Sequence, residues 1–223
     1  MLDTPKSNRA DVVFQAIKSD ILTVRLKPSE KLKINALTEK YDVSLGVVRE
    51  ALSRLVTEDL VQAEPQKGFR VSPIDRNDLI DLTEARISIE QTCLSMSIEQ
   101  GDVKWEGSVI AAFHCLQNTD DRAPGEPNKL SDEWVEAHSD FHNALVSGCS
   151  NSWLNRVRHM LYERAERYRR LSVPLDRTDR NVAAEHQAIK DAVLKRDQSS
   201  VRALIRSHLQ TTTDIFLKSG IDF

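Results

Sequence analysis

The chain has 223 residues, of which 40% are hydrophobic and 29% are charged, and its formal net charge is −3. This length allows one large domain or two modest ones, and no apolar run is long enough to span a membrane. The polar N-terminus lacks a secretory signal and the three cysteines are widely spaced, so we expect a cytoplasmic protein with reduced thiols in its core.

Residues 1–74 carry a net charge of +2, and the remainder carries −5. A mildly basic first third permits a nucleic-acid surface but does not require one.

The first seventy residues predict three helices and a hairpin. A first helix is expected near 9–26, a short one over 36–41 with Asn35 as its N-cap, and a longer one from Ser44 or Leu45 to about Glu58. The segments LVQAE and FRVSP have β character and flank PQKG, which indicates a hairpin. The residues expected to face inward from the first and third helices are Val13, Ile17, Ile21, Val24, Val48, Leu52 and Leu55.

This order of elements is typical of a winged helix-turn-helix, in which the third helix enters the major groove of DNA and the hairpin contacts the backbone or minor groove. Small residues begin the third helix and would allow close approach, while arginines and lysines could contact phosphate or guanine. The helical period and the charge of the third helix do not distinguish a DNA-binding face from an ordinary solvent-exposed face, so the two alternatives are equal at this point. The candidate DNA-contacting residues are Lys33, Ser44, Leu45, Gly46, Val47, Arg49, Arg54, Lys67 and Gly68.

From Asp75 onward the apolar spacing is almost wholly helical. Helices are expected near 75–100, 103–118, 131–148, 152–171, 178–196 and 198–217, and the polar stretch 118–133 is expected to be a loop. The predicted fold is therefore mainly α: a winged helix-turn-helix over residues 1–73, and an all-helical bundle of about six helices over 74–223.

Four histidines interrupt apolar faces of these helices. His138 and His142 are one turn apart, so they leave the same face of one helix, while His186 and His208 lie on two later helices. Buried imidazoles need partners, and ligands from facing helices can hold Zn²⁺ or Ni²⁺ in a bundle core. A histidine on an apolar face is more often a satisfied core residue than a ligand, so the spacing alone favours core histidines and leaves a metal site as the alternative.

Residues 37–73 carry a motif, LTEKYDVSLGVVREALSRLVTEDLVQAEPQKGFRVSP, that resembles the signature of GntR-family transcriptional regulators. The resemblance implies a homodimer that binds double-stranded DNA at a palindromic operator. Where the family usually has Arg after the Ser, this chain has Leu45, and Gly46 and Val47 replace Thr-Pro, whereas Arg49 is retained. We therefore expect an operator unlike those of better-known members.

The segments HSDFHNAL, EHQAI and RSHL resemble the ligand-bearing segments of the FCD-type effector domain, which follows the DNA-binding domain in the fatty-acid-regulator branch of the family. The resemblance implies a divalent transition metal, zinc or else nickel, at which a small carboxylate effector docks. Most members have Asp at position 138. The implied ligands are His138, His142, His186 and His208.

Three softer candidates for effector binding are Arg86, Arg164 and Tyr168; for Arg86 an ion pair with Glu90 one turn away is an equal alternative. A wider resemblance, which includes the histidine at 138, is to a subgroup of carbon-starvation-induced repressors of glutarate and γ-aminobutyrate catabolism. It implies a repressor and a dicarboxylate effector such as glutarate.

Two other functions compete with this interpretation. The bundle could be a metal-dependent hydrolase tethered to DNA, or a metal-free dimerisation domain. A zinc hydrolase needs a nearby carboxylate as base, but the chain has no HExxH motif, and Asp140 lies about 200° around the helix from His138. We therefore expect no enzyme.

Overall fold

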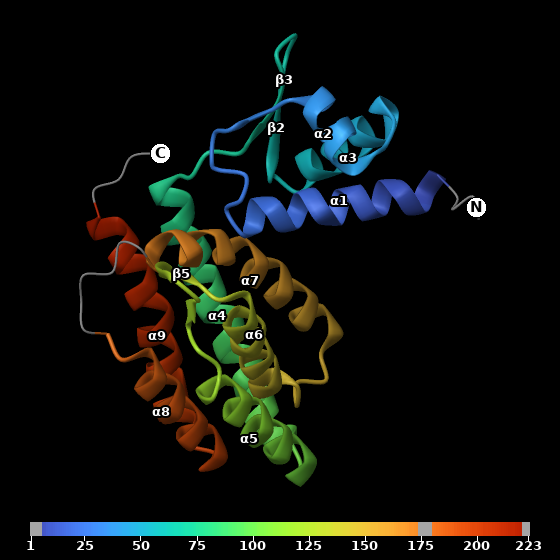
Figure 1. Cartoon of the computed structure of the whole chain (residues 1–223). Helices are drawn as coiled ribbons and strands as arrows, with labels where there is room; N and C mark the ends of the chain where they lie inside the picture. Colours follow the sequence, from blue (N-terminus) through green and yellow to red (C-terminus); the bar gives the residue numbers. More distant parts are fainter. Residues whose placement is uncertain (1–5, 174–179, 220–223) are drawn as a thin grey trace. The chain divides into compact units, whose positions relative to one another are not determined.

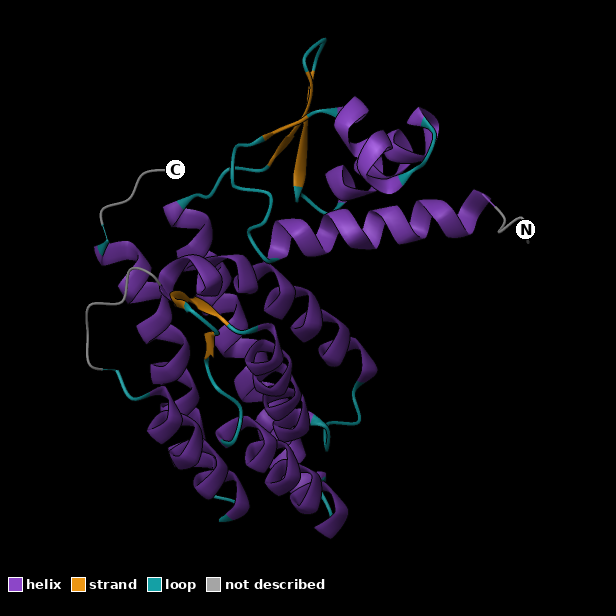
Figure 2. Cartoon of the chain, viewed as in Figure 1, coloured by secondary structure: helices purple, strands orange, loops and turns teal. Residues whose placement is uncertain are grey.

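The computed structural model describes residues 6–173 and 180–219, and most of them are helical (Figure 2). The chain divides into two compact units, with the division between Arg76 and Asn77. The predicted fold class is confirmed: three helices and a hairpin are followed by an all-helical bundle. Among the described residues, no helix is long and apolar enough to cross a membrane.

The N-terminal unit contains three helices and a small antiparallel sheet (Figure 1). Its sheet has the order β1-β3-β2, and Gly68 pairs with Glu64 beside the hairpin turn. The third strand, β1, was not predicted; its two residues pair with Arg70 and Phe69. The elements are α1 (Lys6–Leu22), β1 (Lys31–Leu32), α2 (Ile34–Tyr41), α3 (Leu45–Thr57), β2 (Val61–Glu64) and β3 (Gly68–Val71).

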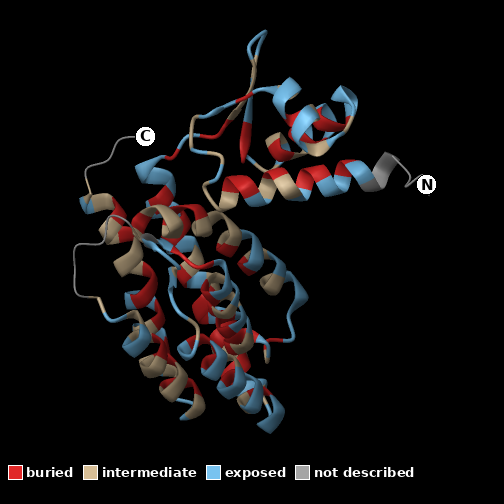
Figure 3. Ribbon diagram, in the orientation of Figure 1, coloured by how far each residue is buried: buried red, intermediate tan, exposed pale blue. Residues whose placement is uncertain are grey.

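Helix α3 packs against α1 and supplies much of the core of this unit. The predicted inward residues Val48, Leu52 and Leu55 are completely buried, because spacings of three and four keep them on one face. The buried stripes of α1 and α3 are visible in Figure 3. The opposite face of α3, with Arg49 at its centre, is left to solvent.

Two predicted helix boundaries were wrong. The first helix ends at Leu22 rather than near residue 26, because Val24 adopts a left-handed conformation (φ 60°) and therefore cannot extend its apolar face. The second helix begins at Ile34, with Lys33 as its N-cap, so Asn35 lies inside the helix and does not cap it.

The buried Asp20 carboxylate ties the turn after α1 to α2. It accepts hydrogen bonds from Nε of Arg25 (2.7 Å), Nζ of Lys40 (2.6 Å) and the hydroxyl of Tyr41 (3.1 Å). Burial alone would raise the pKa of Asp20, but these donors outweigh it and lower the pKa below its ordinary value. The ionised form is therefore favoured by folding.

We expect Asp20→Asn to destabilise the N-terminal unit by about 2 kcal/mol at pH 7, the usual contribution of hydrogen bonds to a charged group. Because the folded-state pKa is depressed, this contribution is fully present above pH ~4 and is lost as the pH falls through the folded pKa. Urea unfolding followed by circular dichroism should show a difference between wild type and variant that shrinks below pH 4. An equal difference at pH 7 and pH 3 would contradict the assignment.

The C-terminal unit is a bundle of long helices (Figure 1). The stretch 118–133, predicted as a loop, contains a short hairpin, because Arg122 pairs with Leu130 and Ala123 with Glu126 around Gly125. The helix predicted over 178–196 is observed over Val182–Leu194, and residues 178 and 179 lie outside the described residues. The elements are α4 (Arg76–Gln100), α5 (Val103–Gln117), β4 (Arg122–Ala123), β5 (Glu126–Leu130), α6 (Asp132–Val146), α7 (Ser152–Ser172), α8 (Val182–Leu194) and α9 (Gln198–Lys218).

The three cysteines are free, as predicted, but they do not all lie in the core. Cys93 and Cys149 are buried, whereas Cys115 is exposed near the end of α5. The expectation of a core thiol was therefore wrong for Cys115, which falls on the solvent side of an amphipathic helix.

Candidate functional site

Side-chain caps set the start of each helix that carries one of the four histidines. The Ser131 hydroxyl accepts a hydrogen bond from the backbone amide of Trp134 at the start of α6. The Asn181 side chain accepts one from the backbone amide of Ala184 at the start of α8. Asp197 caps α9 in the same way. These caps satisfy otherwise unpaired amides.

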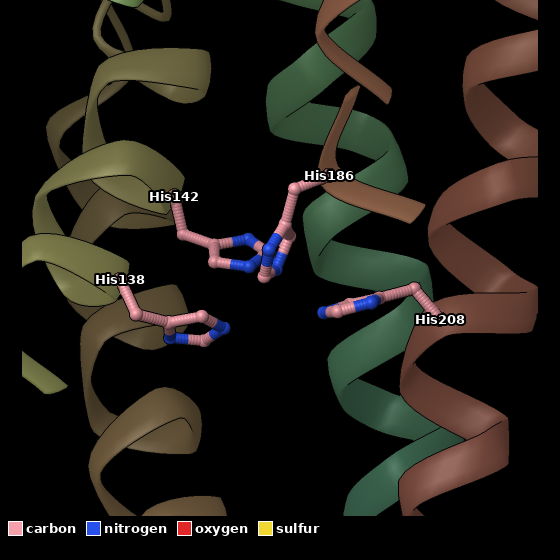
Figure 4. A group of neighbouring side chains, drawn as sticks. All are labelled: His138, His142, His186 and His208. Atoms are coloured by element: carbon pink, nitrogen blue, oxygen red, sulfur yellow. The ribbon is translucent and has the colours of Figure 1, made fainter. Parts of the chain in front are cut away.

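The structure brings His138, His142, His186 and His208 together in the bundle core (Figure 4). All four are buried, and one ring nitrogen of each lies within 4.8 Å of the corresponding nitrogens of the others. The ring centroids of His138 and His142 are 4.5 Å apart, and those of His186 and His208 are 4.8 Å apart. Three helices, α6, α8 and α9, thus supply one cluster of imidazoles.

Hydrogen bonds orient two of these rings. Nδ1 of His208 lies 2.7 Å from Oε2 of Glu185, whose two carboxylate oxygens also accept from Arg180. Burial would raise the pKa of Glu185, but the bonds from Arg180 and His208 lower it to about 2. An ionised carboxylate only accepts, so Nδ1 of His208 donates and its Nε2 has a free lone pair. Nδ1 of His138 lies 3.4 Å from the Tyr162 hydroxyl.

The four imidazoles are held in the neutral form. Burial lowers the pKa of His138 and His142 well below the ordinary value, and neighbouring imidazoles and arginines lower it further. Burial also lowers the pKa of His208, and that of His186 to about 2. Neutral imidazole is the form that ligates metals.

The cluster fits a single metal ion. Nε2 of His142 and Nε2 of His186 are buried without a hydrogen-bond partner, an arrangement that is costly unless another group satisfies them. In a tetrahedral zinc site two imidazole nitrogens are about 3.3 Å apart. The observed limit of 4.8 Å is larger, so the rings have to move inward to bind one ion together. The carboxylate–histidine pair of Glu185 and His208 is a common support of metal ligands.

A small cavity of about 30 Å³ adjoins the cluster and is lined in part by His138 and His208. Two of the three predicted effector residues, Arg86 and Tyr168, also line it, but Arg164 is not among its described lining residues. The sequence interpretation missed Arg169 together with several threonines from α4 and α9. The threonines at the wall are Thr83, Thr212 and Thr213.

Arg86 belongs to a buried charged network. Its Nε lies 3.8 Å from Glu90 and has no hydrogen-bond partner, so the predicted i,i+4 pair is only loosely formed. Glu90 instead accepts from Nε of Arg158 at 2.8 Å, and Arg158 also donates to the carbonyl of His142. Arg86 therefore lies at the cavity wall with an Nε group that can still donate a hydrogen bond.

Most of the predicted DNA-contacting residues lie on the surface of the N-terminal unit. Lys33, Ser44, Leu45, Gly46, Arg49 and Lys67 are exposed, and Gly68 is partly so. Two others do not lie on the open face of α3. Val47 packs into the core, and Arg54 faces α1, where it pairs with Asp11 (2.5 Å) and lies over the Phe14 ring.

Comparison with known proteins agrees with this two-part organisation. Residues 9–71 match the bacterial regulatory proteins of the gntR family, and residues 81–211 match the FCD domain. The chain belongs to the GntR family. As an FCD-containing GntR protein it is a transcriptional regulator whose helix-turn-helix domain binds DNA.

Two curated relatives cover nearly the whole chain. The HTH-type transcriptional regulator BphR of Paraburkholderia xenovorans LB400 is 39% identical over 95% of this chain and 86% of its own length. The HTH-type transcriptional repressor GlaR of Escherichia coli K12 is 36% identical over 91% of this chain and 93% of its own. This GntR-family chain therefore has a repressor among its homologues.

Solved structures share the fold at low sequence identity. A GntR regulator from Rhodococcus sp. RHA1 superposes with a TM-score of 0.75 at 20% identity, covering 95% of this chain and 98% of that one. McbR/YncC of E. coli superposes with a TM-score of 0.73 at 18% identity, covering 94% and 97%.

Proposed function

We propose that this protein is a homodimeric cytoplasmic repressor that binds a palindromic operator through α3 and holds a divalent transition metal at His138, His142, His186 and His208. Zinc is the metal we favour, with nickel as the alternative. The observation that carries the proposal is a buried cluster of four imidazoles, two of which have a ring nitrogen without a described hydrogen-bond partner.

His138 replaces the aspartate found in most FCD domains, so the donor set is neutral. When bound, the metal would supply an uncompensated positive charge that attracts an anion. Arg86 and Arg169 add two guanidiniums to the wall of the adjoining cavity. We therefore propose a small carboxylate as effector, and a dicarboxylate such as glutarate as the first compound to test.

The cavity measures about 30 Å³, which exceeds the roughly 10–15 Å³ that one water molecule needs by the same measure. We propose that a dicarboxylate moves the wall of this cavity when it binds. Tyr168 at this wall donates to Asp78 (2.9 Å), and Thr83 is bonded to Thr213 (2.7 Å). Asp78 lies at the start of α4, which continues directly from the DNA-binding unit in the chain. We propose that an effector acts on the DNA-binding unit by displacing these residues. This requires the effector to bind the DNA-free state with a different affinity from the DNA-bound state.

The DNA-binding part is tested by Arg49→Ala, which removes an exposed charge from α3. We expect affinity for an operator fragment to fall about tenfold at low salt and the slope of log K against log salt to decrease by about one. Fluorescence anisotropy over a salt series measures both. Arg202→Ala, which removes an exposed arginine from α9, is the matched control, and equal losses in the two variants would refute a specific role for α3.

A metal-dependent hydrolase, the alternative function, would need a carboxylate near the metal as general base, and Glu185 is the carboxylate bonded to the cluster. This carboxylate beside the cluster is already bonded to His208 and Arg180, so it orients a ligand and is poorly placed to act as a general base. Ester or amide turnover that chelators abolish would overturn this view.

A further inference from the structure

Leu45 is an exposed apolar residue at the first position of α3. Its exposed fraction is 46%, although the other large apolar residues of that helix are buried or half-buried. Among the described residues, it belongs neither to the core of the N-terminal unit nor to the partly buried residues packed against that core. The fold therefore does not account for a leucine at this position.

The neighbours of Leu45 form an approachable surface. Ser44 and Gly46 are small and exposed, and a side chain at Gly46 would meet only the Ser44 hydroxyl, 3.9 Å away. Arg49 lies one turn further on the same exposed face. A double helix can thus come close to the backbone here, with Leu45 projecting beyond the two small residues.

We propose that Leu45 determines part of the operator sequence by packing against the C5-methyl group of a thymine. The inference rests on the proposed placement of α3 in the major groove. The thymine methyl is the apolar group that base pairs present in that groove, and apolar side chains pack against it. Each half-site therefore contains one thymine whose methyl group Leu45 covers.

The helix geometry also places this thymine. Leu45 and Arg49 are four residues apart, which is about 6 Å along a helix axis, and successive base pairs are about 3.4 Å apart along each strand. With α3 aligned along the base-pair stack, as this inference assumes, the thymine read by Leu45 lies about two base pairs from the guanine or phosphate that Arg49 contacts.

The test begins with duplexes selected from a random pool by the full-length wild-type protein. Each thymine of the selected half-site is then replaced singly by deoxyuridine, which removes only the methyl group. We expect one such replacement to weaken wild-type binding about fourfold, the contribution of one buried methyl-sized group. Leu45→Ala should bind the thymine and uracil duplexes equally. Val12→Ala, which truncates another exposed residue (62%) on α1, should retain the wild-type discrimination.

The other outcomes separate this inference from the proposed function. Selection of a defined duplex whose thymines can all be replaced without loss overturns the role of Leu45 and leaves DNA binding intact. The same sensitivity to uracil in Leu45→Ala and wild type also overturns it. Failure to select any duplex refutes operator binding itself and the inference with it. Leu45→Arg gives a second readout, because we expect it to select guanine in place of the thymine.

Discussion

Replacing His142 with alanine is expected to remove most of the bound metal. The variant loses an imidazole whose Nε2 has no other described partner, so zinc affinity should fall by at least about 100-fold. Metal content is measured by mass spectrometry on protein purified without a nickel column. The wild type should contain about one ion per chain, as a single-site centre requires.

Chelation gives an independent measure of the same site. A ligand present at a thousand times its Kd stabilises the folded state by about 4 kcal/mol, so EDTA should lower the wild-type Tm by about 10 °C. The Tm of His142→Ala should respond little, and Glu185→Gln should retain the site with an affinity about 10- to 100-fold weaker. His114→Ala, which changes an exposed histidine of α5, is the control. Substoichiometric metal in the wild type that His142→Ala leaves unchanged would refute the site.

Glu90→Gln is expected to destabilise the effector domain by about 3–5 kcal/mol. The substitution keeps the shape of a side chain that is 1% exposed but removes its charge. Arg158 and Arg86 would then lie buried without their counter-charge, which costs far more than the loss of a surface ion pair. Because Arg158 also bonds the carbonyl of His142, the metal ligands should loosen at the same time.

Urea unfolding followed by tryptophan fluorescence isolates this effect, since all three tryptophans lie in the effector domain. Glu126→Gln is the matched control, because its partner Lys129 and Glu126 itself are both exposed. We expect the control to cost less than about 1 kcal/mol. Similar costs for the two substitutions would show that the buried network does not stabilise this domain.

Much of the helical architecture was predictable because helix periodicity is local. The burial of Ile17, Val48 and Leu52 follows from apolar spacing alone. The first helix was predicted too long because a left-handed residue, Val24, leaves the pattern of apolar residues unbroken. The β4–β5 hairpin was missed because its residues, apart from Leu130, do not alternate between apolar and polar.

The candidate site was predictable only in part. Four histidines on three helices and a family resemblance indicated a cluster, but spacing within one helix says nothing about distances between helices. Only the tertiary structure placed Glu185 behind His208 and Arg169 at the cavity wall, and turned Arg54 toward α1. Such contacts depend on how helices distant in sequence pack, and many sequences with the same periodicity pack differently.

The sequence by itself thus determined the order of the helices and of the β2–β3 hairpin, the regulator family and which four histidines to consider together. The tertiary structure decided which of their ring nitrogens lack a hydrogen-bond partner and which residues line the adjoining cavity. It also showed that Leu45 does not pack into the core of the N-terminal unit. The physical reason is that periodicity determines which face of a helix is buried, whereas partners, cavities and exposure arise from close packing between faces.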